Sequence, residues 1–115
     1  MIGPSVSIEE VKSTLPTQTA AKELAAALVE KRLAACVQIV GPITSIYGWR
    51  GELNCDEEFC VVCKTTPARL SQLIDYVRSH HPYEVPEILT TRVQASSEYA
   101  SWLFEQVESS ATESK

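Results

Sequence analysis

The stretch that decides the fold is residues 43–63, which read ITSIYGWRGELNCDEEFCVVC. Its first part ends in the aromatic residues of positions 47–49, and its last part, residues 59–63, is rich in β-prone side chains. Residues 49–52 between these two parts include Gly51 and are typical of a tight turn. Two β-type runs joined by a turn predict a long β-hairpin in the middle of the chain.

The residues before this hairpin predict a helix and a strand. Residues 17–34 are rich in alanine and carry leucines at helical spacing, and threonine side chains near residue 17 can cap the first turn. Residues 36–40 are a second β-type run. Gly41 and Pro42 separate this run from residue 43, and because proline cannot donate to a ladder, they predict a bulge, a bend or a sheet edge.

The residues after the hairpin predict two further helices with a strand between them. Apolar positions over residues 67–80 share one helical face, residues 87–93 form a short β-type run, and residues 96–107 again show helical spacing. We expect residues 1–108 to form one domain, and the Ser/Thr/Glu-rich residues 109–115 to be a disordered tail. Residues 5–14 fit either an edge-like strand or an irregular arm.

The predicted order is β-α-β-β-α-β followed by a helix, which indicates an α+β fold of the ferredoxin-like type. Such a fold has a four-stranded antiparallel sheet with two helices on one face. The other face would carry Tyr47, Trp49 and Phe59 in contact with water. An apolar surface of this kind implies a partner, and a second copy of the chain is the simplest one.

Composition restricts the classes of function. The chain has 115 residues, 44% of them hydrophobic, and a formal net charge of −5. Its 10 basic residues are scattered, which argues against a nucleic-acid partner. No apolar run approaches the roughly 20 residues needed to span a bilayer. We therefore expect a cytoplasmic protein without a nucleic-acid or membrane partner.

Four cysteines, at positions 36, 55, 60 and 63, allow more than one interpretation. The spacing of the last three resembles a plant-type iron–sulfur run, and Cys60-x-x-Cys63 resembles a redox pair. Residues three apart on a strand, however, point to opposite faces of the sheet. The interpretation that we favour is four reduced thiols that act as small apolar side chains.

Residues 80–87, HHPYEVPE, form the segment with the most potential ligands. Imidazole and carboxylate groups are common ligands of divalent metals, and the two prolines stiffen the segment. His80, His81, Glu84 and Glu87 are therefore candidate metal ligands. Alternatively, His80 would cap a helix C-terminus, where a histidine favours the negative end of the helix dipole, and the carboxylates would be structural hydrogen-bond acceptors. Tyr83 would orient the neighbouring ligands or bury its ring.

Four stretches in this order resemble the CutA family of divalent-cation tolerance proteins. They are residues 31–37 (KRLAACV), 44–51 (TSIYGWRG), 64–66 (KTT) and 80–87 (HHPYEVPE), and the resemblance extends over about residues 13–102. It implies a ferredoxin-like protomer that forms a homotrimer through its sheets, with the C-terminal helix contributing. It also implies a link to divalent metals, above all copper, and in animal members a link to anchoring of acetylcholinesterase.

The resemblance also implies a ligand set for copper. The histidine and the glutamate proposed in that family correspond to His80 and Glu87, whereas the family's cysteine corresponds to Ser13, counted back from Pro16. A hydroxyl is a poor copper ligand compared with a thiolate. The expected cofactor is therefore copper or another divalent cation, with a weaker copper site than in the family.

Two other functions stay open at this stage. Trimers of this architecture resemble the PII signalling proteins, which predicts a small-molecule site in a cleft between subunits, lined by Tyr83, Glu84, Lys64 and Trp49. A scaffold that anchors another protein is the other alternative. No arrangement of a nucleophile with its base is evident in the sequence, so we predict no catalytic residues and no enzymatic activity.

Overall fold

The computed structural model of the chain describes residues 5–108. Strand β1 (Ser5–Leu15) leads to helix α1 (Gln18–Glu30), followed by β2 (Cys36–Trp49) and β3 (Glu52–Thr65). A single 3-10 turn, η1 (Pro67–Arg69), precedes α2 (Leu70–His80), and β4 (Leu89–Ser96) and α3 (Ser97–Glu108) complete the described part. The predicted α+β order is confirmed. Residues 5–14, which the sequence left undecided, belong to a strand, and the tail predicted at 109–115 lies outside the described residues.

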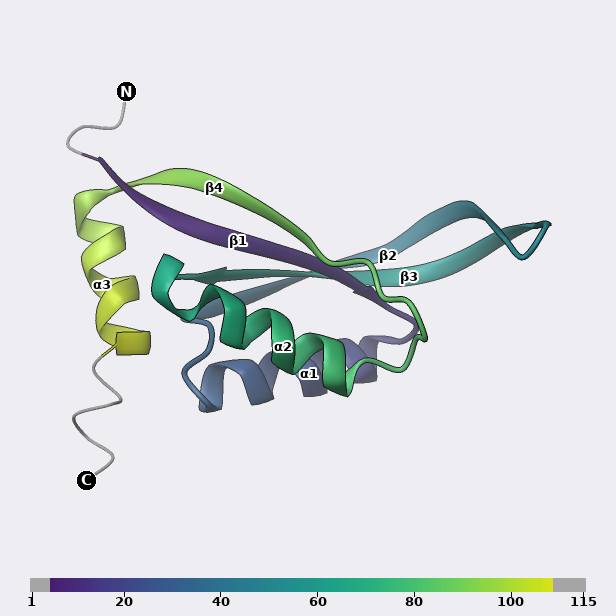
Figure 1. The fold of residues 1–115 in the computed structure, drawn as a ribbon, viewed down its shortest axis with the longest axis horizontal. Coiled ribbons are helices and arrows are strands. Elements are labelled where there is room, and N and C mark those ends of the chain that lie inside the picture. Colours follow the sequence, from purple (N-terminus) through teal and green to yellow (C-terminus); the bar gives the residue numbers. More distant parts are fainter. Residues whose placement is uncertain (1–4, 109–115) are drawn as a thin grey trace.

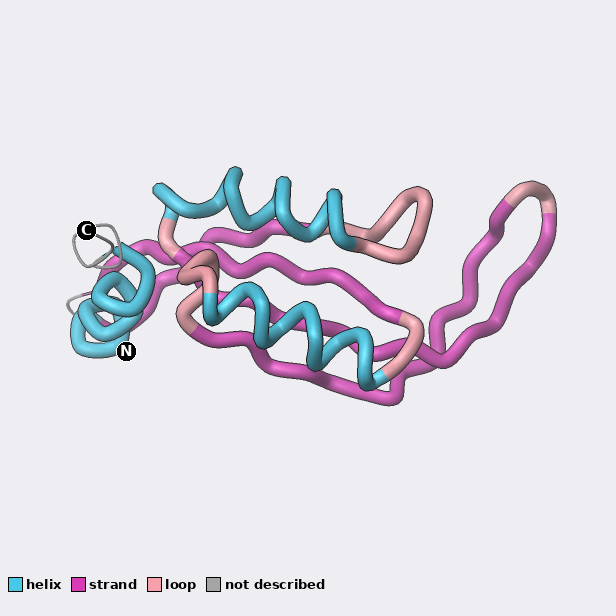
Figure 2. The backbone as a smooth tube through the Cα atoms, turned by 90° about the horizontal axis from the view of Figure 1, so that it is seen from below, coloured by secondary structure: helices cyan, strands magenta, loops and turns pink. Residues whose placement is uncertain are grey.

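The four strands form one sheet in the order β2-β3-β1-β4, and all neighbouring strands are antiparallel. Helices α1 and α2 lie side by side on one face of this sheet (Figures 1 and 2). Helix α3 lies across the end of the sheet near the start of β1 (Figure 1). We call the sheet face away from α1 and α2 the open face.

The predicted hairpin is confirmed, and it extends well beyond the helices (Figure 1). β2 and β3 pair as far as Trp49 opposite Glu52. The two residues between them, Arg50 and Gly51, have φ values of 54° and 79°. Two consecutive residues with positive φ characterise the type I′ turn, whose twist matches that of the flanking strands. Gly51 adopts this conformation without a Cβ clash.

The interruption predicted at Gly41 and Pro42 is a bulge on an edge strand. The β2–β3 register shifts between Val40 and Ile43, and the Gly41–Pro42 peptide bond is cis. A Cβ at Gly41 would stand 2.6 Å from Cδ2 of Phe59. Phe59 packs against the core under the helices, so the expectation that it lies on the exposed sheet face was wrong. The physical reason is alternation, because Phe59 shares a face with Val61.

The core has two parts. The larger part lies between the sheet and the two long helices, and it includes Val11, Leu15, Leu28, Val61 and Leu73. The smaller part packs α3 against the ends of β1 and β4 through apolar side chains: Ile8, Ala35, Ala95, Ala100, Leu103 and Val107. These clusters fix the sheet relative to the helices, so the long hairpin extends from a rigid base.

Two predicted boundaries differ from the structure. The first helix ends at Glu30 rather than near residue 34, because Arg32 has a φ of 58° and leaves the helical conformation. The last strand begins at Leu89 rather than at residue 87. The irregular segment between α2 and β4 is therefore longer than the sequence indicated, and it contains every polar residue of the predicted ligand segment except His80.

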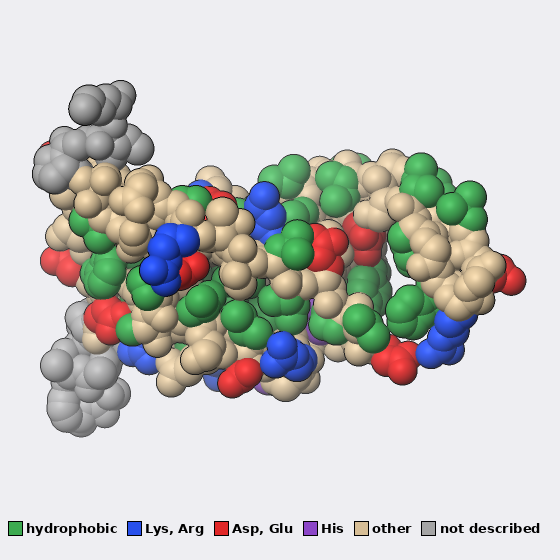
Figure 3. Space-filling model, turned by 45° about the horizontal axis from the view of Figure 1, so that its top comes forward, with side chains coloured by type: hydrophobic (Ala, Val, Ile, Leu, Met, Phe, Trp, Pro, Cys, Tyr) green, Lys and Arg blue, Asp and Glu red, His purple; other side chains and the backbone are tan. Residues whose placement is uncertain are grey.

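The open face carries apolar side chains in contact with water, as the sequence predicted for Tyr47 and Trp49. The space-filling view of this side shows hydrophobic side chains over the middle of the sheet (Figure 3). Val40 and Leu89 are further large exposed apolar side chains of this face, whereas the exposed Ile46 and Leu53 project to the other side of the hairpin, the side of Glu57. Leu53, next to the hairpin turn, is 82% exposed. Among the described helices, none is long and apolar enough to cross a membrane.

Candidate functional site

The hairpin and the segment after α2 enclose a cavity of about 640 Å³ on the open face. We call it the acidic pocket. The side chains that line it come from β1, β2, β3 and the segment: Thr14, Ser45, Ile46, Tyr47, Trp49, Glu58, Pro82, Tyr83, Glu84, Val85 and Glu87. Figure 3 shows a hollow beside the hairpin with acidic side chains at its edge. Within the described residues, this lining holds three carboxylates and no Lys, Arg or His.

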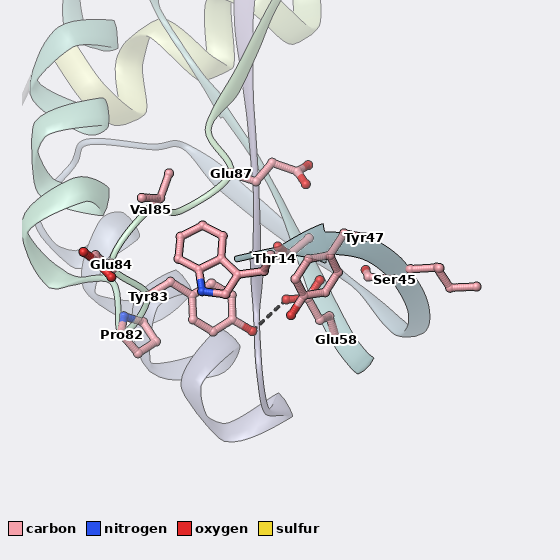
Figure 4. A pocket seen from close by; sticks show the side chains of 11 residues that line it. Thr14, Ser45, Tyr47, Glu58, Pro82, Tyr83, Glu84, Val85 and Glu87 are labelled. Carbon is pink, nitrogen blue, oxygen red and sulfur yellow. Dashed lines mark hydrogen bonds between the residues drawn. The ribbon is translucent and has the colours of Figure 1, made fainter. Parts of the chain in front are cut away.

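Glu58 is the central carboxylate of the acidic pocket. It is only 7% exposed, and its Oε2 accepts a hydrogen bond of 2.7 Å from the Tyr83 hydroxyl. Figure 4 shows this contact at close range: the Tyr83 side chain extends from the segment after α2 to Glu58 on β3. Burial and the bond to Glu58 raise the pKa of the Tyr83 phenol well above its usual range. Tyr83 is therefore a neutral donor at physiological pH.

A second tyrosine–carboxylate pair lies next to the first on the hairpin. The Tyr47 hydroxyl donates to Asp56 Oδ2, and this bond, with the nearby negative charge, raises the Tyr47 pKa. Asp56 and Glu58 are two residues apart on β3, so both project to the same side of the strand, while Glu57 projects to the other. Two carboxylates thus lie close together on this side of the hairpin, each bonded to a tyrosine hydroxyl.

Glu84 has a different partner. Its Oε1 accepts from Arg50 Nη2 at 2.9 Å, which joins the segment to the hairpin turn. The Arg50 guanidinium also lies over the Trp49 ring, 5.2 Å from the ring centroid. Both side chains of the ion pair are largely exposed, so the bridge contributes little stability. It does show that a cation can contact a carboxylate and an aromatic ring of this lining at once.

His81 holds the segment in place instead of facing the acidic pocket. Its Nδ1 accepts from the Tyr83 N–H at 3.1 Å, so the other ring nitrogen, Nε2, is the donor to the Thr14 carbonyl at 2.8 Å. Burial lowers the His81 pKa, against smaller raising effects of Thr14 and Glu58. Both ring nitrogens are used, so metal coordination by His81 would break one of these bonds. Its place in the structure is that of a positioning residue.

His80 lies in a different hollow from Glu87. This second hollow, about 520 Å³, lies against α1 and α2, and we call it the histidine groove. Its lining is Leu15, Ala20, Glu23, Leu24, Ala27, Tyr76, Ser79, His80, His81 and Pro82. The His80 ring stacks on Tyr76 with centroids 3.9 Å apart, and its Nδ1 lies 2.9 Å from the Tyr76 carbonyl oxygen. This arrangement leaves Nε2 as the ring nitrogen open to a ligand.

Ser13 faces the helices, away from the acidic pocket. It pairs with Val61 across the sheet, so its side chain projects to the helix side, whereas its neighbour Thr14 lines the pocket. Ser13 is 1% exposed, and within the described residues its hydroxyl oxygen has no hydrogen-bond partner. Ser13 and Glu87 therefore do not face each other within one protomer.

Three of the four residues predicted to line a ligand cleft lie together. Trp49, Tyr83 and Glu84 all line the acidic pocket. Lys64 does not, because its Nζ donates to Gln38 Oε1 at 2.7 Å and lies 3.8 Å from a Glu10 oxygen, near the other end of β3. The acidic pocket of the protomer is therefore lined by acidic side chains, and Lys64, the basic residue that the sequence predicted there, is not part of its lining.

The cysteines are free thiols in the described part of the chain. Cys63 is buried, and burial raises its pKa to about 12. Cys60 is half-buried on the open face, where burial and the nearby Glu87 raise its pKa against the opposing effect of Lys12. Neither thiol has the lowered pKa of a reactive cysteine. The interpretation of the cysteines as small packing residues agrees with the positions of Cys60 and Cys63, whereas Cys55 is exposed on the hairpin.

Sequence reasoning overlooked Glu58 and Asp56. They stand in the acidic run 56–58 (DEE), which is typical of a solvated hairpin end. A usable signal was the period of two, because Glu58, Cys60 and Val62 alternate on β3 toward the same face. No group of three or more His, Cys, Asp or Glu within residues 5–108 is arranged to hold a metal ion.

Comparison with known proteins gives consistent matches. The family model described as CutA1 divalent ion tolerance protein matches residues 10–106. The divalent-cation tolerance protein CutA of Thermus thermophilus is 45% identical over 98 residues, which cover 84% of this chain and 95% of that protein. Human protein CutA is 43% identical over 104 residues, 90% of this chain. The chain spans 58% of the human protein and 66% of its frog counterpart.

Solved structures match over nearly the whole described part. The cation tolerance protein of Thermus thermophilus superposes with a TM-score of 0.82 at 43% identity, covering 89% of this chain and 99% of that one. A protein from Archaeoglobus fulgidus, named a periplasmic divalent cation tolerance protein, has a TM-score of 0.84 at 32% identity, with 90% and 100% coverage. The fold and the arrangement of its strands are thus those of known structures.

Proposed function

Because this chain belongs to the CutA1 divalent ion tolerance family, we propose that it binds a divalent cation through Glu87 in the acidic pocket. The observation that carries this proposal is the uncompensated negative charge of the pocket. Within the described residues, neither Glu58 nor Glu87 forms an ion pair with a basic side chain, and both line the same cavity. The proposal is for a binding function without a chemical step, in the cytoplasm.

The second ligand that we propose is His80, through its Nε2. His80 and Glu87 line different hollows of the protomer, so one copy offers them on separate surfaces. A homotrimer would let His80 of one copy approach Glu87 of another. The exposed apolar side chains of the hairpin, such as Ile46 and Leu53, support assembly, since a surface of this kind is covered by a partner in stable proteins.

The donor set fits a borderline cation better than a strongly thiophilic one. Imidazole and carboxylate suit Zn²⁺ and Cu²⁺, whereas a thiolate would be needed to favour Cu⁺. Ser13 stands where the family resemblance places a cysteine, and its hydroxyl faces the helices. We therefore propose binding of Cu²⁺ or Zn²⁺ with a modest affinity, completed by water. When bound, the ion would screen the carboxylates of the pocket and link two copies.

A calorimetric titration with Cu²⁺ and Zn²⁺ tests this proposal. Glu87→Gln and His80→Ala should each weaken binding about tenfold or more, by analogy with losses of metal-site groups. Glu30→Gln, at the exposed end of α1, makes the same charge change outside both hollows and should bind like the unchanged chain. Equal affinity of all four proteins would contradict the ligand assignment. Light scattering on the same samples measures the assembly, and a mass near 12.7 kDa would contradict the trimer.

A further inference from the structure

The segment after α2 is joined to the hairpin at a buried carboxylate. The Tyr83 hydroxyl donates to Glu58 Oε2 at 2.7 Å, and Glu58 is only 7% exposed. Burying a carboxylate is unfavourable unless hydrogen bonds or an opposite charge compensate. A movement of Tyr83 away from β3 would leave this buried charge with one donor fewer. The bond therefore holds Tyr83 at one place on the hairpin.

The backbone of the same tyrosine is fixed to β1. The Tyr83 N–H donates to His81 Nδ1 at 3.1 Å, and His81 Nε2 donates to the Thr14 carbonyl at 2.8 Å. The His81 and Tyr83 rings also pack at a tilt, with their centroids 4.9 Å apart. β1 and β3 are paired in the sheet, so both ends of this series of bonds lie on neighbouring strands. We call the four residues Glu58, Tyr83, His81 and Thr14 the anchor chain.

The anchor chain restricts where the proposed ligand Glu87 can lie. Glu87 follows Tyr83 by four residues, and Pro86 directly precedes it. Because proline has a fixed φ and restricts the residue before it, here Val85, the backbone between Tyr83 and Glu87 has little freedom to turn. Figure 4 shows Glu87 apart from the Tyr83–Glu58 contact. Tyr83 thus influences Glu87 through the backbone of the segment, without touching its carboxylate.

A second bond between a phenol and a carboxylate lies nearby and serves as a comparison. Tyr47 donates to Asp56, and both residues belong to the hairpin, so this bond holds no part of the segment. The ion pair of Arg50 with Glu84 does connect the hairpin to the segment. Both of its side chains are largely exposed, however, and exposed pairs contribute little. The anchor chain is therefore the connection that a buried group maintains.

We propose that Tyr83 and Glu58 are positioning residues of the metal site, and that Glu58 acts through Tyr83 instead of coordinating the ion. This inference rests on the proposed function, since it names what holds Glu87 in place for the cation. Groups that orient metal ligands raise the metal affinity, because the unbound site then already has the geometry of the bound one. The anchor chain needs no access from solvent, so it acts equally when a neighbouring copy covers the open face.

Calorimetric titration of Tyr83→Phe and Tyr47→Phe with Zn²⁺ tests this role. Each variant removes one phenol hydroxyl and leaves every carboxylate in place. At a temperature where all proteins are folded, Tyr83→Phe should bind Zn²⁺ about tenfold more weakly, and Tyr47→Phe should stay within about twofold of the unchanged chain. In the Glu87→Gln background, Tyr83→Phe should have no further effect on Zn²⁺ affinity, because its effect passes through Glu87.

Amide hydrogen exchange gives a second measurement that needs no metal. The amide at position 83 donates to His81, and it should exchange faster in Tyr83→Phe than in the unchanged chain, while the amides of α2 keep their rates. Unaltered exchange at position 83 would overturn the proposal. An equal Zn²⁺ affinity of Tyr83→Phe and the unchanged chain would also overturn it, as would an equal loss in Tyr47→Phe or a full effect in the Glu87→Gln background.

The titration separates this inference from the metal proposal. If Glu87→Gln weakens Zn²⁺ binding and Tyr83→Phe does not, the positioning role is refuted and the ligand assignment stands. If Glu87→Gln binds Zn²⁺ like the unchanged chain, the metal site at Glu87 is refuted, and the positioning role that rests on it is refuted as well.

Discussion

The acidic pocket and the histidine groove lie on opposite sides of one short segment, and they differ in what their polar groups do. In the groove, His80 stacks on its own helix and bonds to the Tyr76 carbonyl. In the pocket, Glu58 and Glu87 face a cavity without a basic partner among the described residues. Residues adjacent in sequence can therefore line separate surfaces, and the unpaired carboxylates are the reason why we propose the acidic pocket as the cation site.

The largest expected effect concerns the residue between the two hollows. His81→Ala removes the bonds to the Thr14 carbonyl and the Tyr83 N–H, and it should lower the free energy of unfolding by about 2 kcal/mol. His80→Ala removes an exposed ring and should cost less than about 1 kcal/mol. Urea unfolding of both variants measures the difference. Equal losses would show that the two histidines are not distinct in role.

The next effect compares one tyrosine from each hollow. Tyr83→Phe removes the donor to the buried Glu58 and should cost about 1.5 kcal/mol, the usual range for a bond to a charged group. Tyr76→Phe keeps the ring that stacks on His80 and should change stability by less than about 0.5 kcal/mol. Thermal unfolding of the two variants provides the measurement. A larger loss for Tyr76→Phe would contradict the importance of the Glu58 bond.

Ser13 offers a gain in place of a loss. Its hydroxyl is buried and, within the described residues, unbonded, so Ser13→Ala should raise stability by about 1 kcal/mol. Because Ser13 faces the helices, the same change should leave Zn²⁺ binding unaltered. Chemical denaturation and the Zn²⁺ titration check this pair of results. Weaker Zn²⁺ binding in Ser13→Ala would place Ser13 in the metal site after all.

The smallest effect is a dependence of stability on pH. Burial lowers the His81 pKa in the folded protein relative to its ordinary value of about 6.5. The unfolded chain therefore takes up the proton first, and the stability that neutral His81 provides is complete above about pH 6.5 and is lost as the pH falls below it. The stability difference between the unchanged protein and His81→Ala should shrink between pH 7.5 and pH 5. A stability difference that stays constant over this pH range would contradict a neutral His81 in the folded protein.

The sequence predicted the fold well because local patterns and packing agree in it. The residues that form the hairpin and the apolar stripe of α1 each had one structural interpretation, which the structure confirms, and the Gly41–Pro42 interruption, predicted as a bulge, a bend or a sheet edge, is a bulge on an edge strand. The predicted end of the first helix was too late. Helix α1 ends at Glu30, and nothing in the composition of residues 31–34 indicated the positive φ of Arg32. Residues 5–14 were undecided, because their alternation breaks at Glu9 and Glu10. The structure buries Glu9 and pairs it with Arg92 of β4.

The candidate site was predictable only in part. The chemistry of the segment was evident from its residues, but the separation of His80 from Glu87 depends on where α2 ends. Glu58 became part of the site through long-range pairing, since the hairpin brings β3 to the segment some 25 residues later in the chain. Such proximity is a property of the tertiary structure. Residue types identify possible ligands, and only the fold decides which of them face one another.

A crystal soaked in ZnCl₂ or CuCl₂ would show whether a divalent cation binds at Glu87 in the acidic pocket. An anomalous difference map locates the ion without assumptions about its ligands. We expect a peak about 2.0–2.2 Å from a carboxylate oxygen of Glu87. A peak bound only by residues of the histidine groove, or a map without a peak at Glu87 in saturated crystals, would contradict it.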